Sequence, residues 1–263
     1  MRKNWAKWAG IYTLAVCLTS CATDKKSESE SSVSAELVGA YTEHRELKKE
    51  EFELFKQTYK LMPELTPTQV ATQVVAGMNY AYTCTDNVGN LFKVTIYKPL
   101  PGQGEPRITV VEPVSVYQDI INFVQTGFQE GWQNSSPEDK GLSPVFSYRA
   151  PTAGYALIDI NRDGVMELLL GDTIDDNGND YAMYDIFTFD TRNGTLNHVL
   201  SGGERDRFHF NGGGIIIEEG ANSAEDSFTK CYQLEDGDVK ELPKGTTITE
   251  ELMLVKVTPF VGK

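Results

Sequence analysis

The sequence predicts an α+β fold, with one helix packed on an antiparallel sheet and a mostly-β C-terminal domain after it. Three observations lead to this prediction. The segment 45–62 repeats large apolar residues at steps of three and four, as one face of a helix does. Three β-rich runs follow, at 70–82, 91–97 and 107–112, and turn-rich segments divide them. Beyond Gly154, short β-rich runs alternate with acidic and glycine-bearing turns. A helix followed by such a meander is expected to cover one face of the sheet.

The N-terminal segment has the features of a secretory signal. Arg2, Lys3 and Lys7 make a basic start, and a short apolar run follows at 11–18. That run is far below the roughly 20 residues that a membrane-spanning helix needs. The last residue of the run begins the sequence Leu18-Thr19-Ser20-Cys21, which resembles the lipobox of bacterial lipoproteins. The alternative interpretation is an ordinary signal peptide in which the cysteine has no role.

The lipobox resemblance implies how the chain is held at a membrane. In lipoproteins the cysteine carries acyl chains and the signal is cut before it, so we expect lipidation of Cys21 and removal of residues 1–20. Two or more acyl chains on one residue give stable anchoring, whereas one chain alone is marginal. The expected location is the cell envelope, with the chain anchored at the outer membrane; surface exposure is one option, because the sequence leaves the leaflet open. Residues 21–35 are rich in Ser, Glu and Lys and are expected to form a flexible tether.

The composition is strongly acidic. The formal net charge is −14 at pH 7, and residues 1–20 carry three basic and no acidic side chains, so their removal would bring the charge to about −17. A chain this acidic is not expected to bind nucleic acid or anionic lipid headgroups. Acyl chains, rather than a basic patch, would have to bind the membrane.

A short motif lies inside the first long β-rich run. Ala-Gly within Gln73-Val74-Val75-Ala76-Gly77 would by itself indicate a tight hairpin or a bulge, since Gly adopts positive φ freely. Followed by Asn79-Tyr80, the motif resembles the first hairpin loop of cystatins, the inhibitors of papain-like cysteine proteases. Gly39 precedes the helix, as the trunk glycine does in that family. Leu100-Pro101-Gly102 lies in a second loop that looks like the one in the disulfide-free stefins. The resemblance covers roughly residues 36–113.

The resemblance implies both a fold and a mechanism. Residues 36–113 would form a cystatin-like domain, and residues 114–263 a helix plus β-rich domain. In cystatins the N-terminal trunk and two hairpin loops make an apolar wedge that fills the protease cleft beside the catalytic thiol. A preformed loop loses little conformational entropy on binding. Carried over to this sequence, the wedge would consist of Leu37, Val38, Gly39, Gln73, Val74, Val75, Ala76, Gly77, Leu100, Pro101 and Gly102.

The sequence also departs from the cystatin pattern. Ala40 follows Gly39 where many cystatins have a second glycine, and the Pro-Trp pair and both disulfides of the secreted animal cystatins are missing. These differences bear on affinity more than on fold. The expected function is a membrane-anchored inhibitor of papain-like cysteine proteases. The alternative is a surface adhesion or glycan- and protein-binding lipoprotein that uses both domains as non-catalytic scaffolds.

An acidic motif lies in the C-terminal part. The segment 159–167 offers oxygen atoms at alternating positions, with Gly164 at the sixth. It lacks the twelfth-position glutamate of an EF-hand and instead resembles the calcium loops of FG-GAP repeats. The alternative is a bare Asx-rich turn between two strands, and no cofactor is otherwise required. The candidate calcium ligands are the side chains of Asp159, Asn161, Asp163 and Glu167 and the carbonyl of Val165.

Residue types that enzymes use occur without a catalytic pattern. His44, His198 and His209 belong to no recognisable triad, and the sequence contains no nucleophile elbow, phosphate loop or zinc pair. Cys84 and Cys231 could form a disulfide in an oxidising compartment, which the sequence leaves open. We therefore expect a protein that is not an enzyme.

Overall fold

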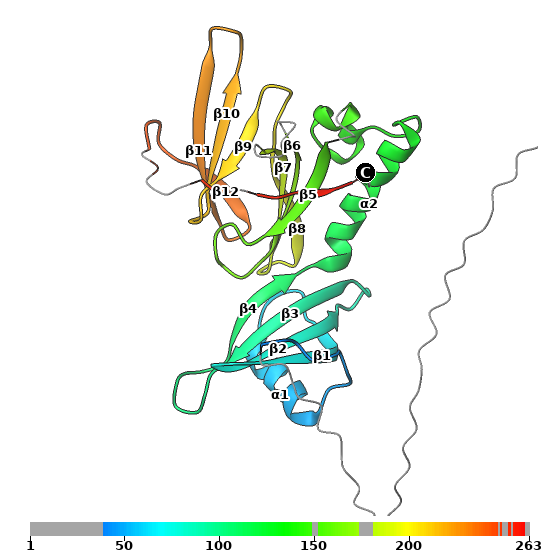
Figure 1. Cartoon of the computed structure of the whole chain (residues 1–263), viewed down its shortest axis with the longest axis vertical. Coiled ribbons are helices and arrows are strands. Elements are labelled where there is room, and N and C mark those ends of the chain that lie inside the picture. Colours follow the sequence, from blue (N-terminus) through cyan, green and yellow to red (C-terminus); the bar gives the residue numbers. More distant parts are fainter. Residues whose placement is uncertain are drawn as a thin grey trace, which may run out of the picture. The chain divides into compact units, whose positions relative to one another are not determined.

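The computed structural model describes residues 39–260 apart from 149–151, 174–180, 247, 249–251 and 254. The first part of the chain forms one helix and four strands (Figure 1): α1 (Lys49–Thr58), β1 (Thr66–Val75), β2 (Gly77–Thr85), β3 (Leu91–Lys98) and β4 (Arg107–Glu112). The second part begins with α2 (Val114–Glu130) and two 3-10 helices, η1 (Pro137–Lys140) and η2 (Pro144–Ser147). Its strands are β5 (Ala153–Ile158), β6 (Glu167–Thr173), β7 (Tyr181–Asp190), β8 (Thr195–Ser201), β9 (Arg207–Phe210), β10 (Ile215–Ala221), β11 (Ser227–Glu235), β12 (Asp238–Glu241) and β13 (Thr258–Pro259).

The expected α+β class is wrong, because the described residues are mostly β. Two α-helices stand against thirteen strands, which form two antiparallel sheets. The helical pattern at 45–62 yields only ten helical residues, since Arg45 pairs with Val70 of β1 through two backbone hydrogen bonds (3.0 and 2.9 Å). The part after α2 adds nine strands and no further α-helix among the described residues.

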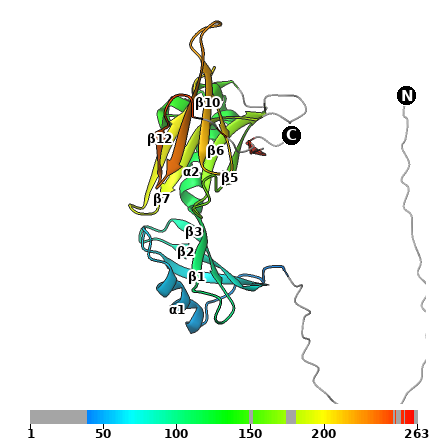
Figure 2. The same ribbon diagram turned by 90° about the vertical axis from the view of Figure 1, so that its left-hand side faces the viewer.

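The smaller sheet has the strand order β1-β2-β3-β4, and each pair is antiparallel. α1 lies against one face of it (Figures 1 and 2). Leu54 and Phe55 of the helix belong to the same buried cluster as Val70, Tyr82 and Val94 of the strands. The helix start is fixed by Glu51, whose carboxylate accepts the Lys48 backbone N–H (2.8 Å) and both guanidinium nitrogens of Arg45 (2.8 and 2.6 Å).

The larger sheet has nine strands, in the order β12-β11-β10-β9-β7-β6-β5-β13, with β8 paired to β7. α2 ends at Gly131, whose left-handed backbone lets the chain turn away. Leu168 and Leu170 of β6 lie in one buried cluster with α2, while Leu169 lies in another. The unbroken apolar run on β6 therefore follows from burial of both of its faces.

The two sheets share a core. Val165 and Phe189 of the second part belong to the buried cluster beneath α1, and the rings of Phe92 and Phe189 meet edge to face at 5.5 Å. The Val111 N–H donates to Gly164 (2.6 Å), and the Met62 N–H donates to Thr191 (2.6 Å). The described residues accordingly belong to one compact unit.

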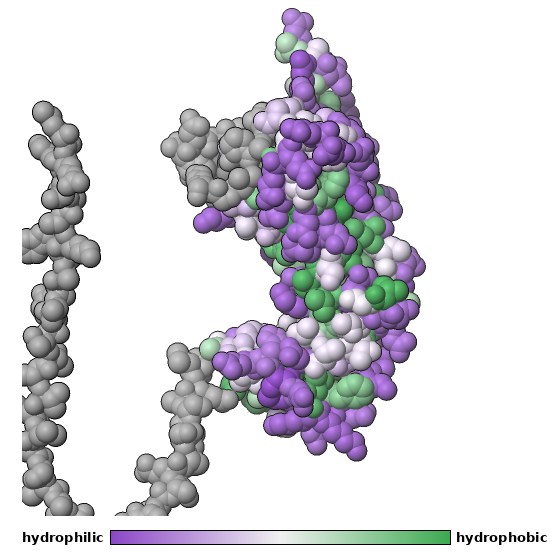
Figure 3. All heavy atoms as spheres, turned by 90° about the vertical axis from the view of Figure 1, so that its right-hand side faces the viewer, coloured by the Kyte–Doolittle hydropathy of each residue, from purple (hydrophilic) through white to green (hydrophobic). Residues whose placement is uncertain are grey.

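The surface agrees with the acidic composition. The face drawn in Figure 3 is largely hydrophilic, with apolar side chains gathered mainly toward its middle. Within the part of the chain that the structure describes, we find no helix that combines the length and the apolar character needed to cross a membrane.

Candidate inhibitory loops

The motif at 73–77 forms the tip of the hairpin between β1 and β2. Val75 pairs with Gly77, so the chain reverses at Ala76. Gly77 has φ +132°, and a Cβ there would lie 2.6 Å from the Lys98 carbonyl oxygen and 2.8 Å from the Tyr97 ring. Two constraints therefore require a glycine at this position: the backbone conformation and the close approach of β3.

Apolar side chains are exposed at this end of the smaller sheet. Val74 and Val75 keep 46% and 40% of their surface exposed, and Leu100 of the second loop keeps 46%. Neither valine belongs to a buried cluster of the core. Such residues are available to bind an apolar surface.

The N-terminal trunk lies beside this hairpin. Tyr41 forms an isolated bridge with Gln73, and the Thr42 N–H donates to the Thr72 carbonyl (2.8 Å). The Gln73 side-chain amide donates to the Gly39 carbonyl (2.9 Å) and accepts from Asn79 (2.8 Å). The structure thus brings Gly39 together with the first hairpin loop. Leu37 and Val38, which the sequence also assigns to the wedge, lie outside the described residues, as do Cys21, residues 1–20 and the tether.

The second loop, between β3 and β4, turns tightly at Leu100-Pro101-Gly102. The Gln103 N–H donates to the Leu100 carbonyl (3.0 Å), and Gly102 has φ +82°. The Tyr97 hydroxyl, just before this loop, donates to the Ala76 carbonyl of the first hairpin. Both loops therefore emerge at the same end of the smaller sheet, and a direct hydrogen bond joins the end of β3, next to the second loop, to the first loop.

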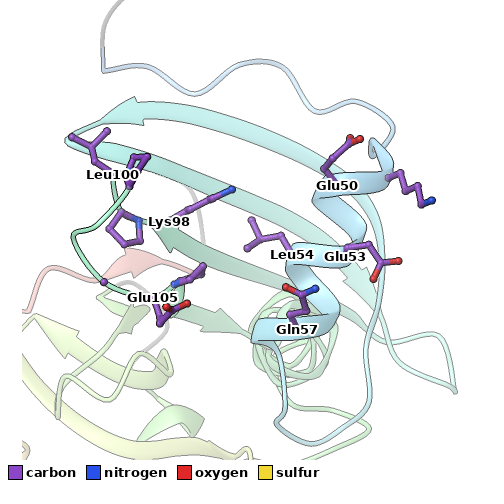
Figure 4. A pocket seen from close by; sticks show the side chains of 12 residues that line it. Glu50, Glu53, Leu54, Gln57, Lys98, Leu100 and Glu105 are labelled. Atoms are coloured by element: carbon purple, nitrogen blue, oxygen red, sulfur yellow. The ribbon is translucent and has the colours of Figure 1, made fainter.

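A groove of about 740 Å³ runs between α1 and the second loop (Figure 4). Leu54 and Leu100 supply apolar walls, while Lys98 and Glu105 bring both signs of charge from the loop side. Its described lining includes no serine, cysteine or histidine. The remaining lining residues are Lys49, Glu50, Glu53, Gln57, Pro99, Pro101, Gly104 and Pro106.

The acidic motif lies in the turn between β5 and β6. Asp159 accepts the N–H groups of Asp163 (3.1 Å) and Gly164 (3.0 Å), and Asp163 accepts the N–H of Val165 (2.7 Å). The Asn161 side chain bonds Asp163 in both directions, donating from Nδ2 (2.8 Å) and accepting at Oδ1 (3.2 Å). These are the local side chain-to-backbone hydrogen bonds of an Asx-rich turn.

Glu167 has different hydrogen-bond partners from Asp159 and Asp163. Its buried side chain accepts the Ile160 N–H (2.9 Å) and the Thr188 hydroxyl (3.1 Å), and burial raises the pKa of its carboxyl to about 8. Across the described residues, no group of three or more His, Cys, Asp or Glu side chains is arranged to hold a metal ion. The donor set as it stands fits the bare turn, and calcium binding to this motif stays a prediction of the sequence.

The two cysteines of the described chain are both free. Cys84 is fully buried in the core beneath α1, and burial raises the pKa of its thiol to about 12. Cys231 is half-buried on β11, and its pKa is also raised by burial. A thiol as deeply buried as Cys84 is a core side chain rather than a nucleophile.

Two cross-strand contacts were not expected from the sequence. One is the Tyr97–Ala76 hydrogen bond described above. The other joins His198 to Asp185, with 2.9 Å between Nε2 and Oδ1; Asp185 is fully buried and also accepts the Ser143 N–H (3.0 Å). Both contacts depend on which residues face each other across a strand pair. No signal in the local sequence marks them.

Comparison with known proteins adds no relative. No protein-family model, curated protein or solved structure matches the chain. The cystatin and FG-GAP resemblances therefore rest on the motifs themselves.

Proposed function

We propose that the protein is a membrane-anchored inhibitor of papain-like cysteine proteases, which acts by inserting the two hairpin loops and the N-terminal trunk into the protease cleft. The single observation that carries the proposal is the exposure of Val74, Val75 and Leu100 on two tight loops at one end of the smaller sheet. Their partner would be the apolar walls of a substrate cleft.

The arrangement suits binding for a physical reason. The first loop is closed by the Val75–Gly77 pair and tied to Gly39 and Tyr97, so little backbone freedom is left to lose when it binds. Fully burying an exposed valine side chain contributes roughly 1.5–3 kcal/mol, and Val74, Val75 and Leu100 have 46%, 40% and 46% of their surface left to bury. These side chains on preorganised loops would therefore favour binding without any reaction by the inhibitor.

The membrane anchor belongs to the same proposal. The lipobox-like segment ending at Cys21 would place the inhibitor at the outer membrane, held by acyl chains. A protease of a host, a competitor or the diet would then be met at the cell surface.

The direct test measures inhibition of papain by a soluble chain that starts at Ala22. Val75→Asp is compared with Val88→Asp. Val88 is 77% exposed in the loop between β2 and β3, at the other end of the same sheet. We expect wild type and Val88→Asp to inhibit alike and Val75→Asp to raise the inhibition constant at least about 30-fold, as loss of a binding hot spot does.

Two results would contradict the proposal. One is a wild-type chain that leaves papain fully active at micromolar concentration. The other is equal inhibition by the two aspartate variants, which would separate inhibition from the loop. Either result would favour the alternative of a non-catalytic adhesion or glycan-binding lipoprotein.

A further inference from the structure

Tyr97 occupies a position between the two candidate loops. It is the last but one residue of β3, directly before the second loop, and it pairs with Asn79 of β2. Its hydroxyl reaches past that pair and donates to the carbonyl of Ala76, the residue at which the first hairpin reverses. One side chain on the root of the second loop thus contacts the tip of the first.

The contact is more than one hydrogen bond. Gly77 packs so closely on Tyr97 that an added Cβ would lie 2.8 Å from ring atom Cε2 and 2.9 Å from the hydroxyl. The guanidinium carbon of Arg107, from the start of β4, lies over the ring at 4.7 Å from its centroid. Arg107 of β4 therefore orients the Tyr97 ring through a cation–π contact. The ring in turn packs against the Ala76–Gly77 peptide.

We infer that Tyr97 is a positioning residue for inhibition: its hydroxyl and ring fix the first hairpin loop relative to the second, so that both meet the protease cleft together. Because the role depends on the loops being inhibitory, it rests on the proposed function. The hydrogen bond lies at the surface, and its loss should therefore leave the core intact while letting the tip of the first hairpin move.

The test compares two substitutions that each remove one hydroxyl from the smaller sheet. Tyr97→Phe keeps the ring against Gly77 but loses the bond to Ala76. Tyr82→Phe is the matched control, because its buried hydroxyl donates to the Glu51 carbonyl (2.9 Å) beneath α1. Tyr97→Phe is expected to weaken papain inhibition about tenfold, mainly by slower association, through lost preorganisation. Its melting temperature should stay near the wild-type value.

The control should behave in the opposite way. Tyr82→Phe loses a buried hydrogen bond, so its melting temperature should fall while its inhibition constant stays near wild type. If Tyr97→Phe inhibits as well as wild type, or if the two variants lose inhibition in proportion to their loss of stability, the positioning role is overturned.

A second measurement separates this role from the proposed function. Amide hydrogen exchange of residues 74–78 reports on the loop without any protease. Tyr97→Phe should speed exchange in that segment, and Tyr82→Phe should not do so selectively. If wild type does not inhibit papain but Tyr97→Phe still frees the loop, the proposed function fails and the positioning of the loop stands. Unchanged exchange in Tyr97→Phe overturns the positioning role whatever the inhibition assay gives.

Discussion

The side chain of Gln73 holds the backbone of Gly39, with 2.9 Å between Nε2 and the carbonyl oxygen. The same side chain accepts a hydrogen bond from Asn79 of β2 (2.8 Å). A single glutamine therefore ties the trunk to both strands of the first hairpin. Gln73, the first residue of the motif, therefore has a structural role in the hairpin, which differs from the role of the exposed valines.

Gln73→Glu should release the trunk. A carboxylate cannot donate to the Gly39 carbonyl, but it can still accept from Asn79. We expect inhibition of papain to weaken about tenfold, a loss of roughly 1.4 kcal/mol, in a chain that starts at Ala22. The loss should vanish when the variant is compared with wild type in chains that start at Ala40, which lack Gly39 and the residues before it. Gln118→Glu on α2, whose amide donates to Asn122 (2.9 Å), is the control; equal losses in both variants would indicate a general charge effect.

Gly77→Ala should displace the first hairpin from β3. Its Cβ would meet backbone at 2.6 Å, at a φ that already disfavours side chains, so we expect a loss of about 1–3 kcal/mol in unfolding free energy together with loss of most inhibition. Gly89 has φ +96° but open space around it. Gly89→Ala should therefore share the backbone strain and keep inhibition. Melting curves and inhibition constants are measured on both, and full inhibition by Gly77→Ala would remove the loop from the binding surface.

Acid should weaken the start of α1. The hydrogen bonds from the Arg45 guanidinium lower the pKa of the Glu51 carboxyl below its ordinary value of 4.5. A carboxyl whose pKa is lower in the folded state stabilises that state above the unfolded pKa, and this stabilisation is lost as pH falls through the folded pKa. The melting temperature should therefore drop below pH 4.5, and Glu51→Gln should show a lower value at pH 7 with a flatter acid limb. Glu53→Gln, at an exposed position on the same helix, should have the melting temperature of wild type both at pH 7 and below pH 4.5.

The two cysteines should differ sharply in reactivity. With a pKa of about 12, the Cys84 thiol is about one part in ten thousand thiolate at pH 8, and the thiolate is the reactive form. Iodoacetamide should label Cys231 first and Cys84 only after unfolding in guanidinium, as followed by mass spectrometry of peptides. Cys231→Ala should leave no fast-reacting site in the described chain. Rapid labelling of Cys84 in the native protein would show that the core beneath α1 opens readily.

The position of the trunk predicts an effect of anchoring. Gly39 lies beside the first hairpin loop, so the segment from Cys21 enters at the end of the sheet that would face a protease. That segment spans at most ~55 Å when fully extended, while a papain-sized enzyme has a radius of gyration of roughly 17 Å. Anchored protein on proteoliposomes should associate with papain more slowly than the chain starting at Ala22. A tether about 20 residues longer should restore the rate, and equal rates for native and lengthened tethers would contradict this geometry.

Local chemistry in the sequence located most elements of the smaller sheet. β3 and β4 cover the β-rich runs at 91–97 and 107–112, and the hairpin turns at Ala76-Gly77 because only glycine suits that backbone. The predicted class of the whole fold was wrong for two reasons. Pairing of Arg45 with Val70 removes the first turn of the predicted helix. The short β-rich runs predicted beyond Gly154 pair into a sheet of nine strands, so strands outweigh helices in the described chain as a whole.

The candidate site was predictable only in part. Exposed valines next to a glycine turn can be read from a motif, since they follow from the turn itself. The Tyr97–Ala76 and His198–Asp185 contacts depend on strand register and on side-chain reach across it. Even between consecutive strands, the local residue pattern does not show which side chain reaches across to which partner.

The shared core has a consequence for how the chain is made. Val165 and Phe189 close the cluster beneath α1, yet both follow the smaller sheet in the chain. A ribosome that adds about 5–20 residues per second would finish β4 several seconds before Phe189. During that interval α1 and its sheet would present an open apolar face, which a chaperone could cover and a protease could attack. Survival of the smaller sheet would therefore depend on how soon the part of the chain that follows it is added and packs against it.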